Sequence, residues 1–284
     1  MEGWNIMILG VRAHDFGKLP VEELALKVSR QGYSYIQLAL AKAIDGIDSS
    51  LGKLSPGMAK YIKDILKKEN VQIAVLGCYI NPIHPNLGER MMQIDRFKEH
   101  IRFARDFGCS IVGTETGSLK GDDSNDYDNE SKSAFETLIY TLRELVKEAE
   151  KFGVIVGIEG GKNEVVSTPQ KMRRVLNLIP SNNLQVIYDP TNYLSSYNFK
   201  DQDEIIKQAF ELFGDRMVAL HAKDFVVKNG EISIVAAGKG DLNYELILRL
   251  IKEKKPFINI LLEDIKEAEM DGSMRFIAEI YNRV

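Results

Sequence analysis

The chain has 284 residues, a length that suits one large α/β domain or two small ones. With 44% hydrophobic and 27% charged residues, its composition is ordinary for a globular protein. The formal net charge of −4 gives no overall attraction to phosphates, which argues against nucleic acid as the main partner.

Short apolar runs alternate with longer segments of helical periodicity along the chain. The runs predict strands at residues 5–11, 35–40, 72–79, 110–114, 154–158, 185–188, 217–220 and 258–262. The segments between them predict helices at residues 20–31, 55–70, 93–107, 133–152, 168–179, 203–213, 244–253 and 270–281. Prolines near the helix starts, and glycines or asparagines near the helix ends, agree with these boundaries.

Several of the strand-like runs are apolar throughout, as in VQIAVLGC, VIVGI and INILL. Strands that are covered on both faces, as in a parallel sheet, have this pattern. Eight β-then-α units in one chain without a linker predict a single (β/α)8 TIM barrel, with residues 1–284 as one domain. A doubly wound open sheet is the competing architecture. The polar stretch at residues 121–131 predicts a loop over the barrel mouth.

Chemically active side chains follow four consecutive predicted strands. The fifth to eighth runs end in Glu159, Asp189, His221 and Glu263. In a βα barrel the strand ends meet at one mouth, so these four groups are expected to lie together. Carboxylates with one imidazole suit Mn2+, Mg2+, Co2+ or Zn2+. Any one acid could simply face solvent, but the set of four predicts a site for one divalent metal ion, with Mn2+ preferred.

These residues also sit in recognisable motifs. IEGG contains Glu159, YDPTN contains Asp189, LHAKD contains His221, LLED contains Glu263, and GKGDLNYE spans residues 238–245. With them the sequence resembles the xylose isomerase-like TIM barrel superfamily, which includes ketose 3-epimerases, hydroxypyruvate isomerase and inosose dehydratase. The resemblance implies that the four groups hold one metal ion. It also implies that Glu159 and Glu263 are the catalytic acid and base.

Two departures from the family pattern bear on the reaction. Many relatives have a histidine three residues after the aspartate of the sixth strand, where this chain has Asn192. Asparagine can hydrogen-bond a sugar hydroxyl but cannot donate a proton in the same way. The DNA-repair relative endonuclease IV needs several histidines for three zinc ions, and this chain has only four in all. Hydrolysis of abasic DNA is therefore disfavoured.

Further residues near the strand ends are candidates for substrate binding. They are His84, Glu115, Asn192 and Lys223. Asp224, three residues after the histidine of LHAKD, could support the metal ligands or join them. For His84, a loop residue without a ligand is an equally good interpretation, and Glu115 could instead buttress a neighbouring loop.

The leading functional hypothesis is a divalent-metal-dependent isomerase or epimerase of a small sugar or sugar phosphate. It would act by proton transfer through a metal-stabilised enediolate. The sequence leaves open which face is reprotonated, and hence whether the reaction is an isomerisation or an epimerisation. An inosose-type dehydratase on the same scaffold, or a non-catalytic sugar-binding barrel, are the alternatives.

The cysteines and the N-terminus bear on location and partners. Cys78 and Cys109 give no disulfide framework, so we expect a cytoplasmic protein. The start MEGWNIMILGVRAHDFG does not resemble a signal peptide, and no apolar stretch approaches the roughly 20 residues of a membrane span. We expect no nucleic acid or membrane partner, and a homo-oligomer remains open.

Overall fold

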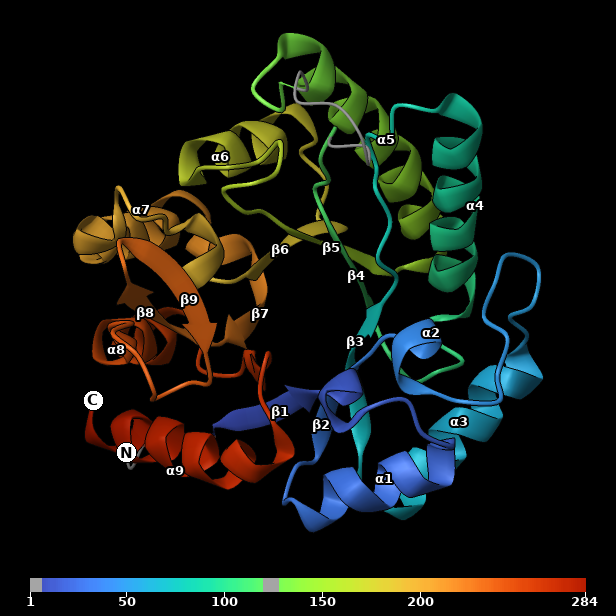
Figure 1. Ribbon diagram of the computed structural model, residues 1–284. Helices are drawn as coiled ribbons and strands as arrows, with labels where there is room; N and C mark the ends of the chain where they lie inside the picture. Colours follow the sequence, from blue (N-terminus) through green and yellow to red (C-terminus); the bar gives the residue numbers. More distant parts are fainter. Residues whose placement is uncertain (1–6, 120–127) are drawn as a thin grey trace.

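The computed structural model describes residues 7–119 and 128–284. Within them, eight parallel strands close into a barrel in the order β1-β10-β7-β6-β5-β4-β3-β2. Figure 1 shows the helices surrounding this ring of strands. The barrel strands are β1 (Ile8–Arg12), β2 (Tyr35–Leu38), β3 (Gln72–Gly77), β4 (Ile111–Glu115), β5 (Ile155–Glu159), β6 (Leu184–Tyr188), β7 (Met217–Ala222) and β10 (Asn259–Leu262). The predicted (β/α)8 TIM barrel is confirmed, and the open sheet is excluded.

The helices surround the barrel, and all except the short α2 bury an apolar face against its outside. They are α1 (Val21–Arg30), α2 (Leu40–Ala43), α3 (Pro56–Lys68), α4 (Leu87–Phe103), α5 (Lys132–Phe152), α6 (Pro169–Leu178), α7 (Gln202–Phe213), α8 (Tyr244–Lys254) and α9 (Glu267–Arg283). Side chains of Ser55, Ser131 and Thr168 accept a hydrogen bond from the first turn of α3, α5 and α6. Such caps satisfy amide groups that have no partner within the helix, and they fix where each helix begins.

Helix α4 begins six residues earlier than the sequence pattern predicts. Asn86 accepts a hydrogen bond from the amide of Glu89 at 3.1 Å, which caps the helix before Leu87. Leu87 is 61% exposed, so the first turn lacks the apolar periodicity on which the prediction rests. The apolar pattern alone therefore could not indicate that the helix begins at Leu87.

The barrel interior is packed with apolar side chains below its mouth. Val75, Ile187, Ala219 and Leu261 belong to one buried cluster contributed by four different strands. A Cβ atom at Gly113 would come within 2.8 Å of the Ile187 Cδ1 atom, so glycine makes room for the larger side chain. Because side chains on a strand alternate between faces, the residues two positions further along also point inward. The polar residues of the barrel mouth occupy these positions, two residues beyond the apolar cluster on their strands.

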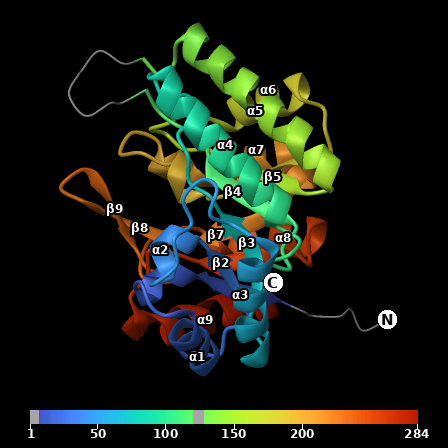
Figure 2. The same cartoon turned by 90° about the vertical axis from the view of Figure 1, so that its right-hand side faces the viewer.

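An antiparallel hairpin that the sequence analysis missed follows the seventh barrel strand. Its strands are β8 (Asp224–Lys228) and β9 (Glu231–Val235). The turn between them uses Asn229 and Gly230, with φ values of 53° and 79°. Asn-Gly is the preferred pair for such turns, because both residues tolerate positive φ. Figure 2 shows the hairpin projecting beyond the end of the barrel where α2 lies.

Other sequence predictions concern the covering loops and the chain's environment. Part of the predicted loop at residues 121–131 falls on residues 120–127, which lie outside the described residues. Cys78 and Cys109 are both buried and free. In the described part of the chain, no helix is both long and apolar enough to span a bilayer.

Candidate metal centre

The four strand-end residues converge at the barrel mouth. One ligand atom from each of Glu159, Asp189, His221 and Glu263 lies within 4.8 Å of the other three. All four residues are buried, and none is more than 6% exposed. Each stands two residues after an inward position of its own strand, and this alternation brings them to one level. The structure therefore brings together the four predicted groups, and their role as metal ligands stays a proposal.

His221 lies at the centre of this cluster. Its Nδ1 atom is 3.1 Å from Glu159 Oε1 and 3.3 Å from Glu263 Oε2. Parallel pairing of β7 with β10 sets His221 beside Leu261, two residues before Glu263. The register of the barrel thus determines that one imidazole nitrogen faces two carboxylates.

Two cationic side chains partly offset the negative charge of the buried acids. The Lys223 Nζ atom lies 2.8 Å from Asp189 Oδ2 and 2.6 Å from Glu263 Oε1. Arg12 lies 3.4 Å from Glu263, but it is also 2.5 Å from Asp264 and therefore shares its charge. Lys223 was predicted as a substrate ligand, whereas here it contacts the acids of the cluster. The sequence analysis did not identify Arg12 and Asp264. Arg12 is nevertheless the last residue of its barrel strand, and it lines the same cavity as Glu159 and Glu263.

The acids of the cluster have different proton affinities. Burial raises the pKa of Glu159, and the attraction of His221 opposes this shift only in part. Burial alone would also raise the pKa of Glu263, but His221 and Lys223 outweigh it and hold this pKa well below its usual range. For His221, burial lowers the pKa, yet the two glutamates outweigh it and raise the pKa to about 9. The protein without metal therefore holds a proton on His221 that a metal ion would displace.

Neighbouring polar groups fix the orientation of the acids. The amide and hydroxyl of Thr191 donate to Asp189 Oδ1 at 2.8 and 2.6 Å. This arrangement leaves the other oxygen, Oδ2, on the side of Lys223. The Asn192 Nδ2 atom donates to Glu159 Oε1 at 2.8 Å. Asn192, predicted to bind substrate, therefore also orients one of the two proposed catalytic glutamates.

The cluster opens into a cavity of about 380 Å³. Glu115, the last residue of β4, lines it and pairs in register with Glu159. Burial raises the pKa of Glu115. Glu164 also lines the cavity, and it accepts hydrogen bonds from the amide and hydroxyl of Thr116 and from the amide of Gly117. Glu115 thus lines the cavity, and its role in substrate binding stays a prediction, while Glu164 braces the loop after β4.

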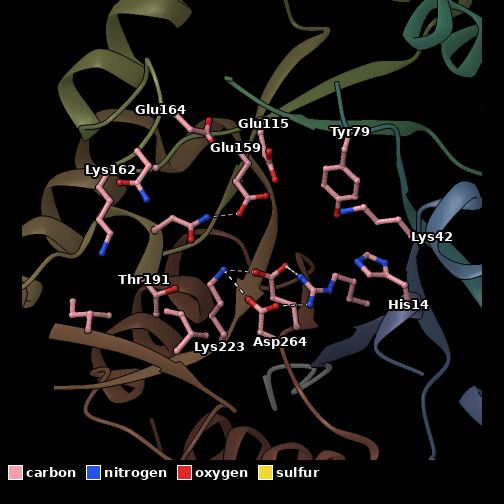
Figure 3. Close-up of a pocket in the computed structure, with 17 residues that line it drawn as sticks. His14, Lys42, Tyr79, Glu115, Glu159, Lys162, Glu164, Thr191, Lys223 and Asp264 are labelled. Atoms are coloured by element: carbon pink, nitrogen blue, oxygen red, sulfur yellow. Dashed lines mark hydrogen bonds and ion pairs between the residues drawn. The ribbon is translucent and has the colours of Figure 1, made fainter. Parts of the chain in front are cut away.

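The cavity has polar and apolar walls. Figure 3 shows His14, Lys42 and Tyr79 on one side, across the cavity from Lys162 and Thr191. The Lys42 Nζ atom lies 4.2 Å from the centre of the Tyr79 ring. The rest of the wall includes Ile232 and Ile234 of the hairpin. The hairpin therefore contributes apolar surface to a cavity that is otherwise mostly charged.

Two sequence candidates lie apart from the cluster. The His84 Nδ1 atom accepts from the amide of Asn86 at 3.2 Å, and among the described residues it is not part of the cavity wall. Its substrate-binding role stays a prediction without support from its position. Asp224 accepts hydrogen bonds from the amides of Phe225, Gly238, Gly240 and Leu242. It organises the GKGD loop and is not a member of the four-residue cluster.

The donor set of the cluster fits a divalent cation. Three buried carboxylates surround one imidazole, and Lys223 offsets only part of their negative charge. Oxygen and imidazole ligands in this proportion suit Mn2+, Mg2+, Co2+ or Zn2+. A bound divalent ion would relieve the mutual repulsion of the acids and keep them ionised.

Sequence comparison links the chain to one family. Residues 26–280 match the family described as xylose isomerase-like TIM barrel. Among curated proteins, none gives a significant sequence match.

Solved structures share the fold at low identity. A xylose isomerase-like TIM barrel protein from Mycobacterium smegmatis, in complex with magnesium, has a TM-score of 0.77 at 15% identity, covering 100% of this chain and 99% of that one. A D-tagatose 3-epimerase-like protein has a TM-score of 0.75 at 19% identity, covering 98% and 99%. The IOLI protein with a bound zinc atom has a TM-score of 0.72 at 16% identity, also covering 98% and 99%. At these identities the likeness establishes the fold alone.

Proposed function

Because this chain belongs to the family of xylose isomerase-like TIM barrels, we propose that it is a divalent-metal-dependent isomerase or epimerase of a sugar or sugar phosphate. The observation that carries the proposal is the convergence of Glu159, Asp189, His221 and Glu263 within 4.8 Å at the base of an open cavity. The D-tagatose 3-epimerase-like neighbour and the metal complexes among similar structures support it.

Glu159, Asp189, His221 and Glu263 would hold the metal ion, for which Mn2+ is our first choice. When bound, such an ion polarises a substrate carbonyl and stabilises the negative charge of an enediolate. Asp189 is suited to a purely ligating role, because three donors from Thr191 and Asn192 hold its Oδ1 atom in place.

Glu159 and Glu263 would exchange protons with the substrate. The Glu263 carboxylate accepts a hydrogen bond from Lys223 and faces Arg12, so it stays ionised, which is the form that a base needs. The Glu159 carboxylate, which accepts a hydrogen bond from Asn192, would serve as its partner in returning the proton. Two carboxyl groups at one site can divide the removal and the return of a proton between them.

The cavity walls would position the substrate above this pair. Its volume of about 380 Å³ is in the range of small-molecule sites. Glu115 and Asn192 can accept and donate hydrogen bonds to sugar hydroxyls. Lys223 lines the cavity while it contacts the acids, so its ammonium group can also contact a substrate oxygen.

Isotope exchange tests the proposal directly. Metal-stripped protein, reloaded with Mn2+, is incubated with ketoses and ketose phosphates in D2O, and products are followed by NMR. We expect deuterium at the carbon beside the carbonyl together with a new isomer or epimer. Loss of water from an inosose-type substrate would favour the dehydratase alternative instead. Metal binding without exchange on any substrate would contradict the proposal and favour the sugar-binding barrel.

Substitutions connect this exchange to the two glutamates. We expect Glu159→Gln and Glu263→Gln to abolish deuterium exchange. Glu144→Gln provides the matched control, because Glu144 lies on α5 in a surface ion pair with Lys98. Near-normal exchange in either of the first two variants would contradict the acid–base assignment.

A further inference from the structure

Gln37 is a buried polar residue at the level of the metal centre, and no sequence motif includes it. It lies in β2, two residues after Tyr35, and is 2% exposed. The Gln37 Oε1 atom is 2.7 Å from His221 Nε2. Its Nε2 atom donates a hydrogen bond to the hydroxyl of Tyr79. One carboxamide thus connects a proposed metal ligand with a residue of the cavity wall.

The contact with His221 determines which imidazole nitrogen carries hydrogen. A carboxamide oxygen only accepts, so the hydrogen in this contact belongs to the Nε2 atom of His221. Once a metal ion has displaced the second proton, the neutral imidazole has a single N–H, and its Nδ1 atom then carries the lone pair. Nδ1 is the atom that faces Glu159 and Glu263 at 3.1 and 3.3 Å. Histidines that bind metal usually donate their second N–H to an oxygen in this way.

The contact with Tyr79 leaves a hydrogen-bond donor at the cavity. Because Gln37 donates to the phenolic oxygen, the hydroxyl hydrogen of Tyr79 is not used in that contact. Burial raises the pKa of Tyr79, so the hydroxyl stays neutral and keeps its hydrogen. Figure 3 shows the Tyr79 ring extending into the cavity beside Lys42.

We propose that Gln37 is a positioning residue that holds His221 as the Nε2–H tautomer for metal binding and leaves the Tyr79 hydroxyl to donate to a substrate oxygen. This inference rests on the proposed function, because it requires both the metal ion and the substrate. The two effects belong to opposite ends of one carboxamide, so different substitutions separate them.

Metal affinity tests the first effect without any turnover. Binding of Mn2+ alone to the metal-stripped full chain is measured by electron paramagnetic resonance. We expect Gln37→Met, which removes the acceptor for His221, to weaken Mn2+ binding by roughly 10- to 100-fold. Gln37→Glu keeps an acceptor oxygen and should retain near wild-type affinity, as should Tyr79→Phe. Gln72→Met is the matched control, because Gln72 is an exposed glutamine at the start of β3.

Kinetics on a substrate found by isotope exchange test the second effect. Tyr79→Phe removes the donor and should lower kcat/KM by roughly tenfold, the value of one hydrogen bond. Gln37→Glu should lower kcat/KM similarly, because its carboxylate would accept the Tyr79 hydrogen. A fall in kcat/KM at unchanged Mn2+ affinity is a pattern that a merely structural Gln37 would not give.

The outcomes distinguish this inference from the proposed function. Wild-type protein that binds no Mn2+ would overturn both. Wild-type protein that binds Mn2+ and turns over, alongside Gln37→Met with unchanged affinity, would overturn the inference alone. Should Gln37→Met fail to fold, the variants Gln37→Glu and Tyr79→Phe decide. Full kcat/KM in both variants contradicts the inference. A lowered kcat/KM at unchanged Mn2+ affinity supports it.

Discussion

Replacing Lys223 with methionine tests whether the buried acids depend on a neighbouring positive charge. Its Nζ atom lies within 2.8 Å of both Asp189 and Glu263, and the residue is only 7% exposed. Removing one partner of a buried ion pair costs about 3–5 kcal/mol, because the other charge stays buried without compensation. At roughly 2 °C per kcal/mol for a chain of this size, the metal-free variant should melt about 6–10 °C below wild type.

Calorimetry on dialysed protein, with and without Mn2+, measures this effect. Lys60→Met is the control, because the pair of Lys60 with Asp64 is exposed to solvent and contributes little to stability. Mn2+ should raise the Tm of Lys223→Met more than that of wild type, since the ion then replaces the missing positive charge. A metal-free Lys223→Met protein that melts within about 2 °C of wild type would refute this reasoning.

Three further outcomes are expected. Glu159→Gln and Glu263→Gln should each weaken Mn2+ binding as well as turnover, and titration calorimetry showing unchanged affinity would remove that residue from the ligand set. Burial raises the pKa of Glu164 to about 8, so the folded chain keeps a proton that the unfolded chain loses above its ordinary value near 4.5. The free energy of unfolding should therefore fall as pH rises from about 4.5 to 8 and lose no more from this group at higher pH. Glu164→Gln should flatten that part of the profile in urea denaturation of metal-free protein, and an unchanged slope would contradict the assignment. Gly113→Ala should destabilise the fold by about 1–3 kcal/mol, because its Cβ would lie 2.8 Å from a side-chain carbon of Ile187, and an unchanged denaturation midpoint would contradict this packing account.

The barrel and the four-residue cluster could be predicted because both depend on regular patterns. Apolar runs alternate with helical segments, and the strand alternation that places Ile187 inside the barrel also turns Asp189 inward two residues later. The carboxyl ends of parallel strands share one mouth, so residue types at these ends could be compared without coordinates. The cluster could therefore be predicted without knowing any distance between its side chains.

Other features depend on information that apolar patterns do not carry. The hairpin β8–β9 had a local signal, since Asn229-Gly230 lies between alternating apolar residues, but the barrel pattern has no place for an extra pair of strands. Gln37 looks like one polar residue within an apolar run. Its importance appears only when the closed barrel brings it within 2.7 Å of His221, 184 residues further along the chain.

The central claim is that four side chains share one divalent ion. Anomalous diffraction from crystals soaked in Mn2+ tests it most directly, because the signal locates the metal without assuming its ligands. We predict one strong peak within bonding distance of Glu159, Asp189, His221 and Glu263, and no such peak in His221→Ala crystals. Absence of a peak in wild-type crystals, or a peak away from these residues, would contradict the claim.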